Sequence, residues 1–335
     1  MPIGLAPPGE CRGPCRYTPR VFGSHLSIAG SMSNALREAE SLAMDTVQVF
    51  TKNQQQWKVK PLPDAEVSAW KAEVARLGWQ GRTTAHASYL INLASPSDEL
   101  WNKSIDLMRV EIERCEELEI PLLIHHPGSS TGSGAEFGIR RIAEAYRKLF
   151  KDTKGFRTVS CLENTVGAGS TLGGPFEELS RLRAAVIELT GEADRVGFCI
   201  DTCHTHAAGY DLSTRAGAET VLDQLDDICG LKHVRALHVN DSKGAAGSHL
   251  DRHEHIGAGT IGGKSLKNSG FAAFVCRREF ASIPKILETP KGNDPSGTPY
   301  DTLNLQRLRK LAPPQEPINN RRRSSESTRR PKPRT

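Results

Sequence analysis

Short apolar segments alternate with amphipathic helical segments along most of this sequence. Each apolar segment is rich in β-branched residues, which is typical of a buried strand. Strands that alternate with helices pair in parallel, and eight such units favour a (β/α)8 TIM barrel over an open, doubly wound sheet. No Gly-x-Gly-x-x-Gly motif opens a helix after the first strand, which weakens a dinucleotide-binding alternative. We therefore predict an α/β fold formed by a single TIM barrel.

The positions of these segments define the expected elements. The strands are expected at residues 21–22, 46–50, 82–85, 122–124, 158–162, 196–200, 234–239 and 283–287. The helices are expected to include residues 64–77, 97–118, 137–150, 175–189, 220–229 and 265–280.

The net charge is unevenly distributed along the chain. The 335 residues have a formal net charge of +5, and residues 313–335 alone carry seven Lys or Arg and two Glu. Residues 1–312 are therefore neutral overall, so they have to bind any anion through local arrangement or bound metal. We predict one TIM-barrel domain over residues 21–312, between a flexible extension at residues 1–20 and a disordered basic tail at residues 313–335.

Composition also limits the cellular setting. No segment approaches the roughly 18 apolar residues that a membrane span needs, so we expect no membrane partner. Eight cysteines in a chain of this length, without a secretory signal, indicate free thiols rather than disulfides. The basic tail predicts a nuclear address or a non-specific DNA tether. The acid-poor first 20 residues leave a mitochondrial transit peptide as an alternative address.

A His, Asp or Glu stands at or just past the end of seven of the eight expected strands. These residues are His25, His86, His126, Glu163, Asp201, His238 with Asp241, and Glu288. In a barrel, all of these strand ends point to one rim, which is where the active sites of this fold lie. Chance placement would supply far fewer.

Histidine and carboxylate are the ligands that zinc and similar divalent metals take. His204 lies one helical turn beyond Asp201, and Asp251 and His253 follow in a Gly-rich loop. With the residues at the strand ends they make nine candidate ligands, enough for three metals if one carboxylate bridges. The nine are His86, His126, Glu163, Asp201, His204, His238, Asp251, His253 and Glu288. Gathering them at one mouth without metal would carry a high desolvation cost.

Other residues of the same types have simpler interpretations. A lone His at a strand end is more often a hydrogen-bonded structural residue than a ligand. We leave six histidines in that class: His25, His125, His206, His233, His249 and His255. Cys199 and Cys203 flank Asp201 without the spacing of a zinc knuckle, so we interpret them as packing residues. Glu254 is interpreted as a solvated loop charge and not as a catalytic base.

Several long motifs contain the candidate ligands and their neighbours. They are HASYLINLASP (86–96), HPGS (126–129), LENTVGAGSTLG (162–173), CIDTCHTHAAGYD (199–211), LHVNDSK (237–243), DRHEHIGAGTIG (251–262) and ILET (286–289). These motifs resemble the endonuclease IV family of abasic-site endonucleases (AP endonuclease family 2). The resemblance extends over residues 21–311, essentially the whole predicted barrel. The resemblance implies a TIM barrel with a trinuclear zinc centre that cleaves DNA 5′ to an abasic site.

The same resemblance implies how the nine ligands divide among three zinc ions. His86, His126 and Glu163 would hold the first ion. Glu163, Asp201, His238 and Glu288 would hold the second, so that Glu163 bridges the two and is the central catalytic ligand. His204, Asp251 and His253 would hold the third. Manganese or iron remains an alternative to zinc in sites of this composition.

The resemblance also implies contacts to the substrate, double-stranded DNA that contains abasic sites. Tyr89 and Leu90 match a family loop that is inserted into the duplex from the minor groove, as apolar and planar wedges are. A second loop, KNQQQW at residues 52–57, departs from the family, because Gln55 stands where an Arg is expected. We expect a monomer without a nucleotide cofactor.

Two other functions are compatible with parts of this pattern. A metal-dependent sugar isomerase or epimerase on a similar barrel would use one or two metals, so the third ligand group argues against it. A catalytically silent DNA-binding or scaffold protein would not need an intact ligand set.

Overall fold

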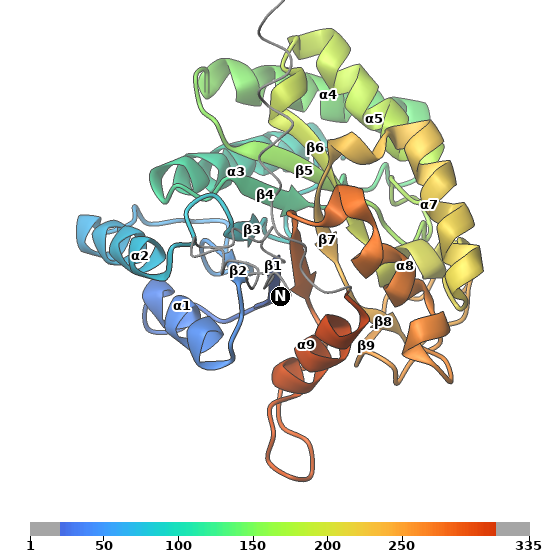
Figure 1. The fold of residues 1–335 in the computed structure, drawn as a ribbon. Coiled ribbons are helices and arrows are strands. Elements are labelled where there is room, and N and C mark those ends of the chain that lie inside the picture. The colour runs from blue at the N-terminus through green and yellow to red at the C-terminus, as the bar shows by residue number, and fades with distance from the viewer. Residues whose placement is uncertain (1–20, 313–335) are drawn as a thin grey trace, which may run out of the picture.

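Eight parallel strands close into a barrel in residues 21–312, the part of the chain that the computed structural model describes (Figure 1). β1 and β10 pair with each other and complete the ring, with Val21 beside Pro284. The predicted TIM-barrel fold is therefore confirmed. The predicted extension at residues 1–20 and the predicted tail at residues 313–335 lie outside the described residues.

The strands follow one another around the barrel in chain order. They are β1 (Val21–His25), β2 (Thr46–Phe50), β3 (Thr84–His86), β4 (Leu122–His125), β5 (Val159–Glu163), β6 (Val196–Asp201), β7 (Val234–His238) and β10 (Pro284–Leu287). Because every pair is parallel, the carboxyl ends of all eight strands lie at one end of the barrel.

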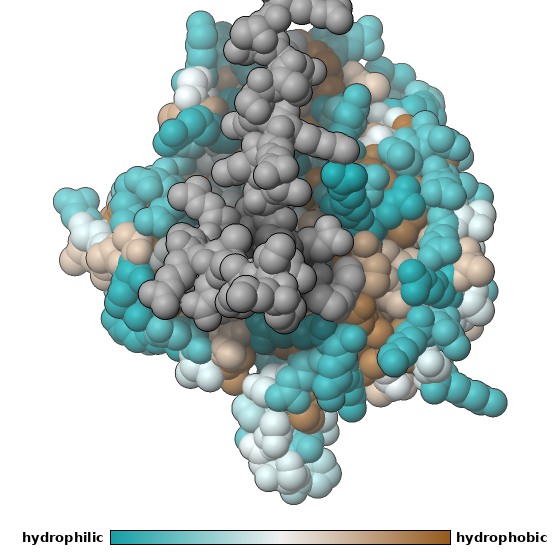
Figure 2. Space-filling model, in the orientation of Figure 1, coloured by the Kyte–Doolittle hydropathy of each residue, from teal (hydrophilic) through white to brown (hydrophobic). Residues whose placement is uncertain are grey.

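Helices surround the strands, with α1 and α2 on the left of Figure 1, α4 and α5 at the top, and α7 and α8 on the right. The ring is formed by α1 (Met32–Ser41), α2 (Asp64–Leu77), α3 (Asp98–Glu117), α4 (Ala135–Asp152), α5 (Phe176–Thr190), α7 (Arg215–Cys229), α8 (Gly270–Cys276) and α9 (Tyr300–Leu311). Hydrophilic side chains dominate the outer helices on the face shown in Figure 2. Within residues 21–312, no helix is both long and apolar enough to cross a membrane.

Local sequence explains where these helices begin and which face they bury. The side chain of Ser97 accepts a hydrogen bond from the Leu100 amide and caps α3. On α4, Ile139, Ile142 and Tyr146 are buried at helical spacing, which is how an amphipathic helix covers a barrel. The helices and the outer faces of the strands thus share one large core.

A smaller apolar cluster fills the inside of the barrel below the rim. It consists of Leu122, Ile124, Cys161, Cys199 and Ala236. These residues come from four neighbouring strands, so the interior is packed and is not a pore. All six cysteines of the described residues are free, as predicted.

One expected helix is wrong. Residues 265–280 form a 3-10 turn (Leu266–Asn268), the short helix α8 and a second 3-10 turn (Arg278–Phe280). α8 begins at Gly270, after Ser269 in an extended conformation, and the Gly270 amide donates to the Leu212 carbonyl oxygen at 2.9 Å. An added Cβ at Gly270 would come within 2.6 Å of that oxygen. Arg277 then adopts an extended conformation, with φ −61° and ψ 127°, which ends the helix.

Three small elements between β6 and β10 shape the rim. α6 (Thr202–Ala207) begins directly after β6, and β8 (Asp241–Ser242) pairs antiparallel with β9 (His253–Glu254). Asp241 is fully buried and accepts backbone N–H bonds from the turn at residues 257–262. This carboxylate therefore anchors the Gly-rich loop that follows β9, and it holds no place among the nine candidate ligands.

Candidate metal centre at the carboxyl end of the barrel

The nine predicted ligands all lie at one end of the barrel. Strands β3, β5, β6 and β7 end at a ligand, and β4 and β10 each end one residue before a ligand. α6 carries His204, the segment that leads into β9 carries Asp251, and β9 begins at His253. Eight of the nine residues form three groups whose ligand atoms lie within 4.8 Å of one another: His86, His126 and Glu163; Glu163, Asp201, His238 and Glu288; and Asp201, His204 and His253. Asp251 is not in any of these groups.

The first group contains His86, His126 and Glu163. Nε2 of His86 lies 3.1 Å from Oε2 of Glu163, and Nε2 of His126 lies 3.2 Å from the same oxygen. Two imidazoles thus converge on one carboxylate oxygen, which is the arrangement that a metal between the three side chains requires.

The second group uses the other oxygen of Glu163. Nδ1 of His238 lies 2.8 Å from Oε1 of Glu163 and 3.2 Å from Oε2 of Glu288. It also lies 4.0 Å from Oδ2 of Asp201. Glu163 therefore presents one oxygen to each of two groups, as a bridging carboxylate does.

The third group forms where α6 faces the first residue of β9, and Asp251 lies beside it. Nε2 of His204 lies 3.2 Å from Oδ1 of Asp251, and Nε2 of His253 lies 3.6 Å from the same oxygen. Asp201 belongs to this group as well as to the second, and its Oδ2 lies 3.7 Å from Nε2 of His253. The geometry thus places Asp201 between the second and third groups, whereas the family pattern implied a place in the second group alone.

The carboxylates and imidazoles shift one another's pKa values. Burial opposes ionisation of Glu163, but His238 and His126 outweigh burial and hold its pKa well below the usual range. Burial likewise opposes a charge on His204, but Asp201, Asp251 and Glu163 raise its pKa to about 10. In the absence of metal, protonated imidazoles supply the positive charge that balances these buried carboxylates.

In four of the candidate histidine ligands, one ring nitrogen contacts an oxygen atom of the protein. Nδ1 of His86, His204 and His253 contacts a backbone carbonyl at 2.8, 2.9 and 3.2 Å. Nε2 of His238 lies 2.9 Å from Oε1 of Gln48. In each case the other nitrogen is turned toward the carboxylates, which is how protein contacts orient a metal-binding imidazole. Nε2 of His253 is buried without a hydrogen-bond partner among the described residues. The donor set therefore fits divalent metals.

Three polar residues that support the ligands were missed by sequence reasoning. Gln48, in the middle of β2, also donates from Nε2 to Oε1 of Glu288 at 2.7 Å. Asn240 donates from Nδ2 to Oδ2 of Asp201 at 2.7 Å, and Asn164 accepts from the Asp201 amide at 2.7 Å. Two sequence signals could have identified these residues. One is a polar Gln at the centre of a mainly apolar strand, and the other is an Asn one or two residues past a ligand.

Two residues that were left out of the ligand set lie close to it. Nδ1 of His25 is 2.9 Å from Nε2 of Gln48 and 3.5 Å from Oε1 of Glu288, so His25 borders the second group. Burial raises the pKa of the Cys199 thiol to about 12, which disfavours a thiolate ligand. Cys203 is likewise buried, and its pKa is also raised to about 12 by burial.

The remaining histidines and Glu254 make contacts of a structural kind. His125 pairs with the Tyr146 hydroxyl at 2.6 Å, and burial lowers its pKa to about 4. His206 accepts from the Leu212 amide, His249 contacts the Val166 carbonyl, His255 stacks on Tyr300, and His233 lies in the 3-10 turn before β7. Glu254 is half-buried rather than solvated and lies 3.9 Å from Lys243.

Of the three predicted DNA contacts, Tyr89 lies beside the first group. Tyr89 is 63% exposed, and its ring centroid lies 5.5 Å from that of His86 and 6.2 Å from that of His126. Leu90 is half-buried and packs against the core, and Gln55 is exposed in the loop after β2.

A cavity of about 470 Å³ opens above the ligands, and Lys243 and Arg252 contribute cationic groups to its wall.

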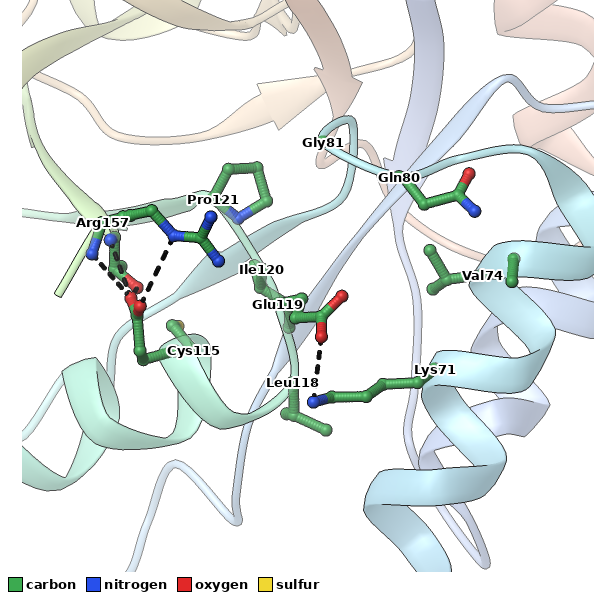
Figure 3. A pocket seen from close by; sticks show the side chains of 13 residues that line it. Lys71, Val74, Gln80, Gly81, Cys115, Leu118, Glu119, Ile120, Pro121 and Arg157 are labelled. Carbon is green, nitrogen blue, oxygen red and sulfur yellow. Dashed lines mark hydrogen bonds and ion pairs between the residues drawn. The ribbon is translucent and has the colours of Figure 1, made fainter.

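A second cavity, of about 560 Å³, lies at the opposite end of the barrel (Figure 3). Its charged side chains are paired with one another. Nζ of Lys71 lies 3.0 Å from Oε1 of Glu119, and Nε of Arg157 lies 3.9 Å from Oε1 of Glu116. This end of a TIM barrel generally serves stability and not catalysis.

Known proteins that resemble this chain cover almost all of the barrel. A family model described as a xylose isomerase-like TIM barrel matches residues 36–310. A protein of Chloroflexus aurantiacus named probable endonuclease 4 is 43% identical over 290 residues, which are 87% of this chain and 97% of that protein. A probable endonuclease 4 of Geobacter sulfurreducens is 41% identical over 290 residues, 87% of this chain and 94% of that protein. The crystal structure of endonuclease IV from Thermus thermophilus superposes with a TM-score of 0.73 at 35% identity, covering 88% of this chain and 98% of that chain.

Proposed function

Because this chain belongs to the endonuclease IV family, we propose that it hydrolyses the phosphodiester bond 5′ to abasic sites in double-stranded DNA. Family membership itself makes the chain a DNA repair nuclease, and thus a hydrolase. The proposed products are a 3′-hydroxyl and a 5′-deoxyribose phosphate. The proposed active form is a zinc-loaded monomer.

The observation that carries this proposal is the position of Glu163 between two groups of ligands. Its two oxygens lie 3.1 Å from His86 and 2.8 Å from His238. A shared carboxylate of this kind supports two metals held at a short, fixed separation. In our proposal His86 and His126 complete the first site, and Asp201, His238 and Glu288 complete the second.

The third proposed zinc site is formed by His204, Asp251 and His253, with Asp201 facing it from the second site. Bound zinc would supply Lewis-acid stabilisation of the phosphate and activation of water near neutral pH. Four carboxylates cannot neutralise three divalent cations, so the loaded centre keeps a positive charge that attracts phosphate. No residue of the chain has to act as a covalent nucleophile.

Side chains around the cavity suit the binding of a damaged duplex. Tyr89 offers an exposed aromatic ring beside the first group, and Lys243 and Arg252 offer cations to DNA phosphates. An abasic nucleotide has no base to stack, so less energy is needed to extrude it than to extrude an intact one. Selection of the lesion can therefore come from the ease of extrusion.

A sugar isomerase or epimerase is the rival activity on this type of barrel. The third ligand group argues against it, because that reaction would use one or two metals. The exposed ring of Tyr89 and the cations of the cavity wall are also better suited to DNA than to a small sugar.

The test is an incision assay on a duplex that contains one tetrahydrofuran abasic analogue. We expect a cut 5′ to the analogue that leaves a 3′-hydroxyl, loss of activity with a chelator, and recovery with added zinc. A lyase would need the aldehyde of a natural abasic site. Cleavage of a natural site with no cleavage of the analogue would therefore refute the proposed reaction.

A further inference from the structure

Two rim loops contact each other beside the proposed metal centre. One loop follows β2, spans residues 51–60 and carries Gln55, and the other follows β3, spans residues 87–92 and carries Tyr89. The Ser88 hydroxyl donates to the carbonyl oxygen of Gln54 at 2.6 Å and links the loops directly. Ser88 is buried, so this link lies beneath the surface that the two loops present.

A single buried carboxylate on α3 holds the beginning of both loops. One oxygen of Glu111 accepts from the hydroxyl of Thr51, and the other accepts from the amide of Ser88 at 3.2 Å. Glu111 is 1% exposed, so neither bond competes with water. Replacement of Glu111 would therefore remove a hydrogen-bond acceptor from both loops.

Two cations next to Glu111 fix the backbone of the loop after β2. Nζ of Lys52 lies 3.8 Å from Oε1 of Glu111 and donates to the carbonyl oxygens of Asn53 and Gln56, both at 3.0 Å. The Arg114 guanidinium donates to the carbonyl oxygens of Thr51 and Lys60. The loop is thus held at its beginning, in its middle and at its end by charge-assisted hydrogen bonds.

Stability alone does not account for this arrangement. Burial raises the pKa of Glu111 and lowers the pKa of Lys52, so for both groups burial outweighs their mutual attraction. Buried ion pairs of this kind often add little stability compared with apolar residues of similar size. What these side chains do supply is a set of hydrogen-bond partners that defines the geometry of the loop backbone.

We propose that Glu111 is a positioning residue that joins the two rim loops into one unit for reading DNA. The inference rests on the proposed function, in which Gln55 and Tyr89 contact the damaged duplex. A preassembled unit would bind with a smaller loss of conformational freedom than two independent loops. Glu111 touches neither the ligands nor the cavity, so it would act on DNA binding and leave the chemical step unchanged.

The first test compares Glu111→Gln with Glu113→Gln in the zinc-loaded full-length chain. Gln keeps the shape of Glu111 but loses the charge that faces Lys52, and its amide can no longer accept from both loops. Glu113 lies on the same helix with an exposed side chain, so it is the matched control. For Glu111→Gln we expect KM for the analogue duplex to rise about tenfold with kcat within about twofold, as for loss of one buried bond to a charged group. For the control we expect both constants to stay within about twofold.

A second readout follows the DNA itself. With 2-aminopurine opposite the lesion, the fluorescence rise on binding should be smaller for Glu111→Gln than for Glu113→Gln at saturating protein. If Glu111→Gln does not fold, Ser88→Ala replaces it. This change removes the hydroxyl that donates to Gln54 and accepts from the Leu90 amide, and it keeps the bond from the Ser88 amide to Glu111. We expect Ser88→Ala to raise KM about threefold.

A double-mutant cycle tests whether the loops act as one unit. In the parent chain, the effects of Gln55→Ala and Tyr89→Ala on KM should depart from a simple product by about threefold, as expected for coupled residues. In the Glu111→Gln background, the two effects should multiply. Multiplicative effects in both backgrounds, or equal KM for Glu111→Gln and its control, would overturn the inference alone. A parent chain that cannot incise the duplex would instead refute the proposed function, and the inference with it.

Discussion

At the scale of single residues, Glu163 is the residue whose substitution should most strongly disturb the proposed centre. It is fully buried, and its two oxygens face imidazoles of different groups. Glu163→Gln keeps the shape but removes the shared charge, so we expect incision to fall by several orders of magnitude while the circular dichroism spectrum is retained. Bound zinc, measured by mass spectrometry, should also fall. His25→Ala should reduce activity far less, and the opposite ranking of these two variants would overturn the proposed ligand set.

Gln48 should control how firmly the second group holds its metal. Its carbonyl oxygen fixes Nε2 of His238, and its amide donates to Glu288. Loss of such supporting contacts typically costs about 10–100-fold in metal affinity. We expect Gln48→Ala to release zinc to a colorimetric chelator faster by about that factor. The exposed Gln56→Ala is the control, and equal release rates for the two variants would contradict the supporting role.

His204 connects metal binding with pH. In metal-free protein its pKa is about 10, against 6.5 for an ordinary His, so its charged form stabilises the fold fully below pH 6.5. That contribution is lost as pH rises from 6.5 through about 10. Zinc needs the neutral imidazole and should therefore displace this proton. We expect calorimetry at about pH 8 to show proton release on zinc binding, reduced in His204→Gln; equal release by the two proteins would contradict the raised pKa.

At the scale of elements, the alternating pattern predicted the eight strands and the rim that carries the ligands. Strand bounds moved by a few residues, as in β3, which ends at His86 and was expected to end at residue 85. The supporting contacts could not be predicted, because Gln48 and His238 are 190 residues apart in sequence and meet only when the barrel closes. The expected helix at residues 265–280 is interrupted where Ser269 is extended and the Gly270 amide bonds to Leu212, a contact between distant residues that periodicity does not reveal.

The loop after β2 carries Gln55 at the position where the resemblance to the family implies an Arg, and Gln55 is exposed there. We predict that Gln55→Arg tightens binding to abasic duplex by about 1 kcal/mol, because it restores one charge-assisted contact to DNA. Fluorescence anisotropy at matched salt would measure the change. Unchanged or weaker binding would mean that this loop meets DNA in a different way.

At the scale of the whole molecule, the net positive charge of the chain lies in a segment outside the predicted barrel domain. Residues 313–335 account for the full +5, and residues 1–312 are neutral. We propose that this segment attracts duplex DNA and directs the chain to the nucleus. Deleting residues 313–335 should leave kcat unchanged and reduce nuclear accumulation. It should also lower the salt slope of DNA binding by roughly 0.9 for each phosphate that is no longer neutralised. An unchanged slope together with unchanged localisation would refute both roles.

Closure of the barrel by β1 and β10 has a consequence for the life of the chain during synthesis. Glu288 is the last of the nine candidate ligands to leave the ribosome, and β10, which carries it to the rim, pairs with the first strand of the barrel. A chain that stops before β10 lacks both Glu288 and the strand that closes the ring. Under the proposed function, such a chain would have neither the complete ligand set nor the closed barrel that incision requires.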